Sequence, residues 1–284
     1  MNRKKITEQL GFWVLRLCMG VVGLILLLVL FDIAEKGIGT ISWQFLTQPP
    51  KNGMTEGGIF PAIFGTFLVT VLTAVLAVPL GMGCAVYLNE YAGDNMFTRL
   101  IRMSIRNLSG VPSIVYGLFG VVLFIQMMRI NTCVLASGLT LGLMTLPWTI
   151  TASEEALKNV PQSYRDGALA LGATRWQAIR TNVLPYSISG MLTGTILGLA
   201  RAAGETAPIL FTGVAFFLPF LPSSLSEQFM ALPYHLYIMA TQHHEIETVR
   251  PIAYATALVL IALICSMNMF AVILRYKLRK QKKG

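Results

Sequence analysis

The stretch Ile59–Leu88 reads IFPAIFGTFLVTVLTAVLAVPLGMGCAVYL and contains no Asp, Glu, Lys or Arg. A helix rises about 1.5 Å per residue, so roughly 20 apolar residues cross about 30 Å of hydrocarbon while satisfying their own backbone hydrogen bonds. This stretch is longer than one crossing needs, and we expect it to be tilted, broken or extended beyond the bilayer. It predicts a membrane-spanning helix.

Five further stretches share this apolar character. The predicted spans are Phe12–Phe31, Ile59–Leu88, Asn107–Met128, Thr132–Thr151, Tyr186–Leu218 and Ile252–Leu274. Of the 284 residues, 55% are hydrophobic and only 12% are charged, whereas a soluble domain has about 25% charged residues. The first stretch is too long for the apolar part of a secretory signal, so we interpret it as a retained helix. We predict an all-α membrane protein with six transmembrane helices.

The Lys and Arg residues orient these helices. The chain has 22 basic and 13 acidic residues, a net charge of +9, and cytoplasmic loops collect positive charge. Only Lys36, Lys51, Arg129 and Arg250 lie in loops on the opposite side from the basic runs. We therefore expect both termini in the cytoplasm and the chain in the inner membrane. The basic tail 276–284 fits this topology and can meet anionic lipid, whereas charge in short runs between spans argues against nucleic-acid binding.

The inner loop 153–185 reads SEEALKNVPQSYRDGALALGATRWQAIRTNVLP. Ser153 before two glutamates predicts a helix start, and Pro161 predicts a break before a second helix that Ser163 would cap. We expect Arg165 to be free to face water or a partner, together with Arg175 and Arg180. Gly172 and Ala173 carry little bulk and would allow two short helices to cross or to meet a partner closely. A short amphipathic helix of this kind suits docking onto another protein, but periodicity alone also fits an ordinary charged loop.

The spacing within this loop resembles the cytoplasmic "EAA" loop of ABC importer permeases. Asp166–Ala168 occupies the E-A-A triplet, Gly172 follows six residues after Asp166, and Leu184–Pro185 closes the motif. The first two triplet positions depart from the family pattern, as does Asn182, where the family often has an aliphatic residue. The resemblance implies a type I ABC importer permease fold whose loop couples to an ATPase. The residues it assigns to coupling are Glu155, Arg165, Asp166, Gly167, Ala168, Gly172, Ala173, Leu184 and Pro185.

The fifth predicted span has a small-residue face and a charged pair. Gly190, Gly194 and Gly198 recur every four residues and predict close packing against another span, of this chain or of a partner. Arg201 and Glu205 are also four apart, which makes them neighbours on one helix in an apolar stretch. They form either a structural ion pair or an anion pathway in which the Arg fork binds a tetrahedral oxyanion. Pro208 would loosen the same helix nearby.

The run Arg201–Pro208, RAAGETAP, narrows the resemblance to permeases of the phosphate-specific transport system. The similarity covers residues 55–275, so we divide the chain into residues 1–54, a first helix with an outer loop, the permease core 55–275 and the tail 276–284. It implies phosphate import, with Arg201, Glu205 and Thr206 in the substrate pathway. It also implies three partners: a cytoplasmic ABC ATPase dimer, a second permease that completes a heterodimer, and an extracytoplasmic phosphate-binding protein.

Enzymatic activity is not expected of the chain itself. It contains no G-x-x-x-x-G-K-[ST] motif, so ATP and Mg would be used by the partner ATPase, and we expect no cofactor on this chain. His235, His243, His244 and Glu245 lack dependable metal-ligand spacing. A permease for sulfate, molybdate or phosphonate stays open as an alternative. So does an ion-coupled secondary anion transporter, although it should show more pathway carboxylates.

Overall fold

The computed structural model describes residues 3–280, which are mostly helical. The helices are α1 (Arg3–Gly37), α2 (Trp43–Thr47), α3 (Phe60–Val86), α4 (Met96–Leu108), α5 (Ser113–Gly120), α6 (Val134–Lys158), α7 (Gln162–Ala170), α8 (Arg175–Ala178), α9 (Leu184–Gly204), α10 (Ala207–Thr212), α11 (Leu232–Thr241) and α12 (Ile246–Lys280). Three π-helical turns extend or join them: η3 (Tyr87–Tyr91), η4 (Val121–Met127) and η5 (Ile179–Val183). Two 3-10 turns, η1 (Ile38–Thr40) and η2 (Asn52–Met54), and a small antiparallel hairpin of β1 (Pro50–Lys51) and β2 (Glu56–Gly57) complete the described chain.

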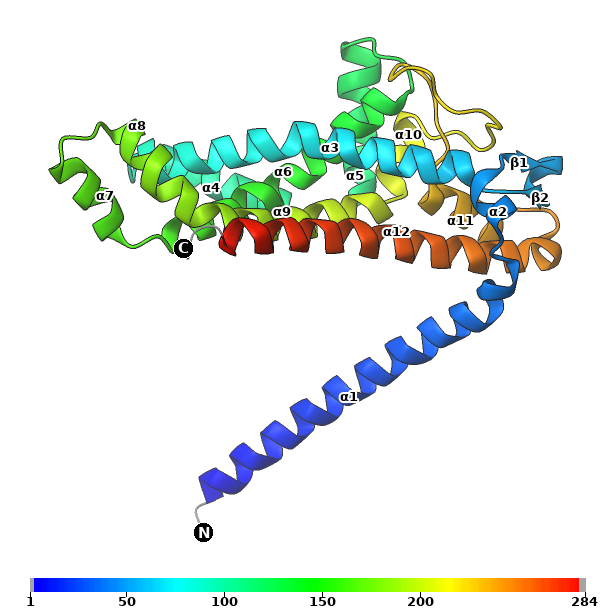
Figure 1. Cartoon of the computed structure of the whole chain (residues 1–284), viewed down its shortest axis with the longest axis horizontal. Helices are drawn as coiled ribbons and strands as arrows, with labels where there is room; N and C mark the ends of the chain where they lie inside the picture. Colours follow the sequence, from blue (N-terminus) through cyan, green and yellow to red (C-terminus); the bar gives the residue numbers. More distant parts are fainter. Residues whose placement is uncertain (1–2, 281–284) are drawn as a thin grey trace.

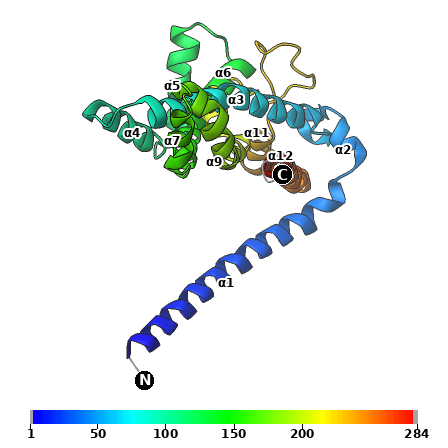
Figure 2. The same cartoon turned by 60° about the vertical axis from the view of Figure 1, so that its left-hand side comes forward.

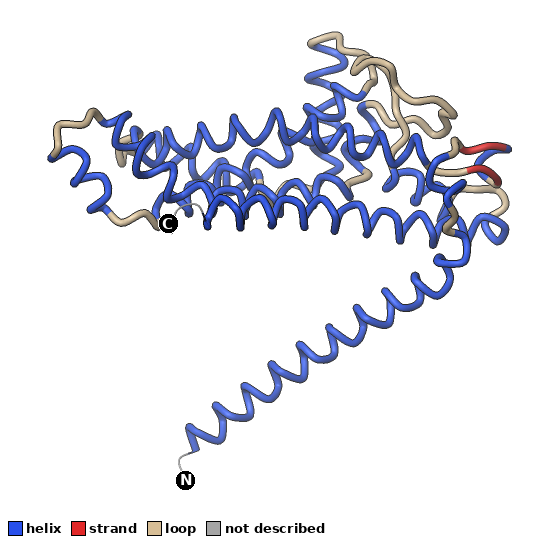
Figure 3. The backbone as a smooth tube through the Cα atoms, viewed as in Figure 1, coloured by secondary structure: helices blue, strands red, loops and turns tan. Residues whose placement is uncertain are grey.

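The long helices form an elongated bundle. Figure 1 shows α3, α9 and α12 along its long axis, and α6 packs between α3 and α9. The loops lie mostly at the two ends of the bundle and in residues 213–231 (Figure 3). We call the two ends the α7 end and the α11 end.

Helix α1 stands apart from this bundle. It leaves at an angle in both views and touches the rest of the chain through α12 and the η1 turn (Figures 1 and 2). None of its most apolar 18-residue window is buried within the chain. An apolar helix exposed in this way is stable only when lipid or another protein covers it.

The spans agree with prediction in number but not always in extent. Within residues 3–280, five helical segments are long and apolar enough to cross a membrane, and a sixth is obtained when α4 and the α5–η4 segment count as one broken span. These two segments meet at an angle of 106°. The predicted span Asn107–Met128 therefore forms its helix only from Ser113 to Met127, its first two residues belong to α4, and its predicted start is wrong. Gly110 and Pro112 lie in the break, and Pro112 favours extended backbone before it.

Helices α6 and α9 also have different limits from those predicted. Helix α6 continues to Lys158, seven residues beyond the predicted end at Thr151. Helix α9 stops at Gly204, whereas the prediction ran to Leu218. The short helix α10 and an irregular segment follow instead, because Glu205 has extended backbone angles.

The glycine face of α9 lies against α6. A Cβ on Gly190 would lie 2.9 Å from the Cβ of Ala156, and a Cβ on Gly194 would overlap the Cβ of Ala152. Gly198 faces the Cβ of Trp148 one turn further along. The glycines therefore pack within the chain, where helix approach depends on small residues because lipid provides no hydrophobic drive between helices.

We predict that Gly194→Ala destabilises the protein, whereas Gly83→Ala does not. Overpacking typically costs about 1–3 kcal/mol, which exceeds the helix gain of about 0.5–1 kcal/mol from replacing glycine by alanine. Gly83 lies in α3 with nothing within 4 Å of an added Cβ, so it is the matched control. The check is the thermal unfolding midpoint of each variant in detergent. Equal midpoints for the two variants would contradict the α6–α9 contact.

Candidate functional site

The chain breaks its helix beside the predicted pathway residues. Helix α9 ends at Gly204, Glu205 follows in extended conformation with ψ 134°, and Pro208 lies in the first turn of α10. The expectation that Arg201 and Glu205 share one continuous helix is therefore wrong, as is the expectation that Pro208 kinks it. Gly204 ends the helix readily, and a proline in a first helical turn loses no backbone hydrogen bond.

Arg201 and Glu205 nevertheless form an ion pair across this break. The Arg201 Nε donates a hydrogen bond to Glu205 Oε1 over 3.2 Å. The side chain of Arg201 is 48% exposed, whereas that of Glu205 is 17% exposed. Among the described residues, neither Nη group of Arg201 donates a hydrogen bond to the protein. The guanidinium therefore has donors available for an anion.

Trp148 of α6 supports the same guanidinium. The Arg201 Cζ lies 5.5 Å from the centroid of the Trp148 ring, within the range of a cation–π contact. The sequence does not indicate this contact, because Trp148 and Arg201 lie on different helices and far apart in the chain. The contact depends on the register of α6 against α9, which the sequence does not give. In the structure, Gly198 lies beside Trp148, in the turn of α9 that precedes Arg201.

Thr206 lies in the break between α9 and α10. Its carbonyl accepts the backbone N–H of Leu210, but its hydroxyl makes no capping bond to α10. Within residues 3–280 no hydrogen bond joins Thr206 to Arg201 or Glu205. Its place in the pathway stays a prediction.

The predicted coupling loop is shorter than its sequence indicated. Ser153 is buried inside α6 and does not start a helix, so residues 153–158 continue that helix and Glu155 lies exposed near its end. Helix α7 begins at Gln162 after Pro161, and Ser163 lies within it and does not cap it. Leu157 is buried, so the packed apolar face of α6 continues beyond the predicted end of the span, and the helix extends with it.

Gly172 forms the turn between α7 and α8. Its φ is +82°, and an added Cβ would meet nothing within 4 Å. The Gly172 N–H donates to Leu169 O over 3.0 Å, and the Ala173 N–H donates to Ala168 O over 3.1 Å. This is the Schellman arrangement that ends a helix in a left-handed glycine. Gly172 makes no close helix contact within the described chain, so that part of the expectation is wrong and the backbone turn requires the glycine instead, whereas close contact with a partner stays a prediction.

The other loop residues divide into buried and exposed sets. Ala168 is buried, and Leu184 and Pro185 are half-buried at the start of α9. Asp166 is exposed and accepts a hydrogen bond from Gln162 Nε2 over 3.0 Å. The exposed set contains Gly167, Leu169, Leu171, Arg175, Trp176 and Arg180. Helices α7 and α8 thus present an apolar and basic surface, which we call the α7–α8 surface.

Arg165 is not free, contrary to expectation. Its guanidinium contacts the carboxylate of Glu90, which lies in η3, with Nη2 2.7 Å from Oε1 and Nε 3.1 Å from Oε2. The Arg165 side chain is 15% exposed and that of Glu90 is 7% exposed. Sequence spacing could not reveal this pair, because the two residues are 75 positions apart.

The histidines near the α11 end are not grouped for a metal. His243 Nε2 lies 3.0 Å from Gly53 O, and its Nδ1 accepts the backbone N–H of Glu245. Burial, aided by nearby His243, lowers the pKa of His235 to about 4, so this imidazole is neutral at pH 7. In the part of the chain that the structure describes, no group of three or more His, Cys, Asp or Glu could hold a metal ion.

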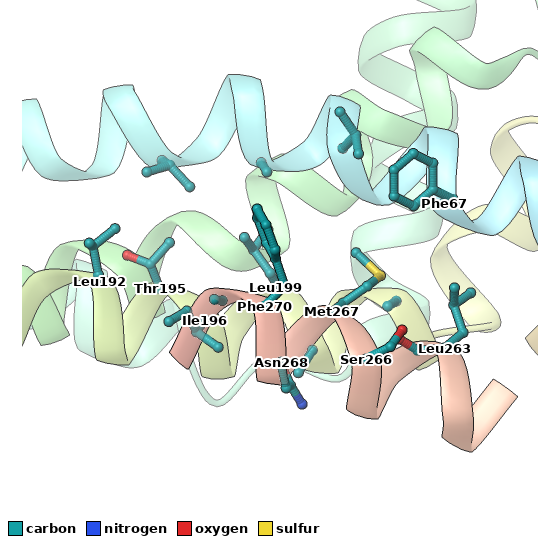
Figure 4. Close-up of a pocket in the computed structure, with 16 residues that line it drawn as sticks. Phe67, Leu192, Thr195, Ile196, Leu199, Leu263, Ser266, Met267, Asn268 and Phe270 are labelled. Carbon is teal, nitrogen blue, oxygen red and sulfur yellow. The ribbon is translucent and has the colours of Figure 1, made fainter. Parts of the chain in front are cut away.

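A cavity of about 540 Å³ lies between α3, α9 and α12 (Figure 4). Phe67, Leu199 and Met267 line it from the three helices, and none of its lining residues is charged. Such a cavity suits apolar groups and offers no donor fork to an oxyanion.

Comparisons with known proteins agree with this architecture. The family profile described as "Binding-protein-dependent transport system inner membrane component" matches residues 77–280. The chain is 35% identical to the probable ABC transporter permease protein YqgI of Bacillus subtilis, over 75% of this chain and 72% of that protein. It is 34% identical to the phosphate transport system permease protein PstA 1 of Mycobacterium tuberculosis, over 80% of this chain and 72% of that protein.

The fold is also found among solved transporters. A bacterial ABC transporter involved in the import of alginate aligns with a TM-score of 0.70 at 13% identity, covering 96% of this chain and 98% of that chain. This confirms the predicted type I ABC importer permease fold. Because the family profile covers well over half of the sequence, the chain belongs to the family of binding-protein-dependent transport system inner membrane components.

Proposed function

We propose that this chain is a permease subunit of an ATP-driven importer of inorganic phosphate. The observation that carries the proposal is the half-exposed Arg201 guanidinium, held by Glu205 and Trp148, whose Nη groups donate to no residue within the described part of the chain. A planar Arg fork donates two parallel hydrogen bonds to a phosphate, which a single amine cannot do. The name of the M. tuberculosis relative, a phosphate transport system permease protein, supports the choice of anion.

The Arg201 region would bind phosphate weakly enough to release it. Glu205 occupies the Nε side of the guanidinium, so the anion would meet the remaining donors and the repulsion of a nearby carboxylate. Trp148 fixes the plane of the guanidinium from its face. The break at Glu205 lets α9 tilt independently of α10, which would open the site alternately to each side of the membrane.

The α7–α8 surface would dock onto a cytoplasmic ABC ATPase dimer. Its exposed Leu171 and Trp176 provide the apolar contacts, and Arg175 and Arg180 provide charge around them. Helix α1 begins and α12 ends toward the α7 end (Figure 1), so the positive-inside rule would place the α7 end and both termini in the cytoplasm of the inner membrane. ATP and Mg would be used by the ATPase, with no cofactor on this chain.

Two further partners complete the proposed assembly. A second permease would form a heterodimer and, with lipid, would cover the exposed apolar surface of α1. A phosphate-binding protein would deliver the anion at the α11 end. The alginate importer has also been solved with a substrate-bound periplasmic protein, which supports this general organisation.

The function is tested by co-purifying the tagged chain with its partners and reconstituting the complex in lipid vesicles. We expect an ATPase and a second permease in the purified complex, and ATP-dependent uptake of labelled phosphate when the binding protein is present. Uptake of sulfate, molybdate or a phosphonate in its place would select one of the alternative oxyanions. Uptake driven by an ion gradient without ATP would overturn the importer assignment.

We predict that Arg201→Gln lowers phosphate uptake by about 10–100-fold, because hydrogen bonds to a charged group contribute about 1.5–3 kcal/mol. Assembly should be retained, since the side chain is half-exposed. The matched control is Arg99→Gln in α4, which removes the same charge from an exposed pair with Asp94. The measurement is the initial uptake rate in vesicles. Normal uptake by Arg201→Gln would refute the anion role.

We also predict that Gly172→Ala weakens the attachment of the ATPase, whereas Gly167→Ala leaves it unchanged. An alanine in the left-handed conformation costs about 1–2 kcal/mol, so the turn that sets α7 against α8 would shift. Gly167 lies inside α7 with open space around an added Cβ and ordinary helical backbone. The measurement is the amount of ATPase retained per permease after washing. Equal retention in both variants would show that the turn does not shape the docking surface.

A further inference from the structure

A buried polar cluster joins four helical elements at the α7 end. We call it the arginine clamp and define it as Glu90, Arg102, Glu154 and Arg165. Besides the two contacts with Glu90, Arg165 donates from Nη1 to Val160 O over 2.9 Å and from Nη2 to Leu157 O over 3.1 Å. One side chain of α7 thus holds both the η3 turn of α3 and the carbonyl end of α6.

Arg102 of α4 makes the second half of the clamp. Its Nη2 donates to Leu88 O in η3 over 2.7 Å, and its Nε lies 2.7 Å from Glu154 Oε1 on α6. Lys158 Nζ also lies 3.0 Å from Glu154 Oε1. The ends of α3 and α6 are therefore fixed to each other by arginines from two short helices.

Of the four residues of the arginine clamp, Arg165 lies on the helix that the ATPase would displace in the proposed mechanism. Its helix also carries Gly167 and Leu169, two exposed residues of the α7–α8 surface. Helix α9 follows this surface directly along the chain through α8 and η5. Helices α3 and α6 come before α7 in the chain. The short linker 159–161 between α6 and α7 transmits a displacement of α7 to α6 only if that linker is stiff. The Arg165 contacts provide a direct route to both helices.

The displacement of α9 along the chain and the displacement of α3 and α6 through Arg165 must occur together to preserve the proposed anion site. Trp148 lies on α6 and Arg201 on α9, so a displacement of α9 alone would separate the ring from the guanidinium. A bidentate Arg–carboxylate pair resists sliding and rotation better than a single contact. Because the pair is buried, loss of either partner leaves a charge without compensation.

We propose that the Arg165–Glu90 ion pair makes α3 and α6 follow α7, so that Arg165 and Glu90 are positioning residues that couple ATP hydrolysis to phosphate movement. This inference rests on the proposed function. It assigns to Arg165 a contact inside the permease, where the loop motif by itself suggests contact with the ATPase.

The test uses the complete reconstituted transporter and the Glu90→Gln variant. Glutamine keeps the shape of Glu90 and leaves the two bonds from Arg165 to carbonyl oxygens possible, but it removes the charge. We expect the number of phosphate ions transported per ATP hydrolysed to fall at least about fivefold, with basal hydrolysis and ATPase attachment unchanged. The matched control is Asp94→Asn, which neutralises a carboxylate of similar position in an exposed pair with Arg99. It should keep the wild-type ratio.

The ratio of phosphate transported to ATP hydrolysed distinguishes a loss of coupling from a loss of folding. A merely structural role would lower assembly, hydrolysis and transport together and leave the transport-to-hydrolysis ratio of the assembled complex unchanged, which would overturn the proposal. If Glu90→Gln does not assemble, Glu90→Asp is measured by the same ratio, because it keeps the charge and shortens the reach of the carboxylate. An unchanged ratio in that variant overturns the link as well. Failure of the wild-type complex to transport phosphate would instead overturn the proposed function.

Discussion

The close approach of α9 to α6 is the contact on which the rest of the structure depends. Three glycines at four-residue spacing face the Cβ atoms of Ala156, Ala152 and Trp148, so the two backbones approach closely. In lipid, where apolar side chains gain little from leaving the solvent, such close packing and its dispersion contacts hold helices together. The same register sets Trp148 over Arg201.

Two arginines illustrate how the surroundings of a charge decide its role. Arg165 uses Nε, Nη1 and Nη2 in four hydrogen bonds and is largely buried, so it joins three helical elements. Arg201 uses only Nε among the described residues and is half-exposed, so it has capacity for a ligand. A charge in an apolar protein must be compensated, and the completeness of that compensation distinguishes a structural residue from a binding residue.

Interruptions of the helices shape the functional regions. Gly110 and Pro112 turn the chain between α4 and α5, Gly172 separates α7 from α8, and Gly204 ends α9 beside Glu205. Gly172 adopts a left-handed conformation that a regular helix excludes, and Pro112 disfavours helical backbone in the residue before it. The second break forms the α7–α8 surface, and the third separates Arg201 on α9 from α10.

The sequence by itself determined the membrane class, the approximate spans, the family motif and the candidate charges Arg201 and Glu205, because each of these depends on neighbours along the chain. Hydropathy is summed over a window, and the loop motif is a spacing, so neither needs a fold. The tertiary structure alone decided that Arg165 pairs with Glu90, that Trp148 supports Arg201 and that Gly172 serves a turn. These roles depend on which helix faces which and in what register, and that register arises only when distant segments pack together.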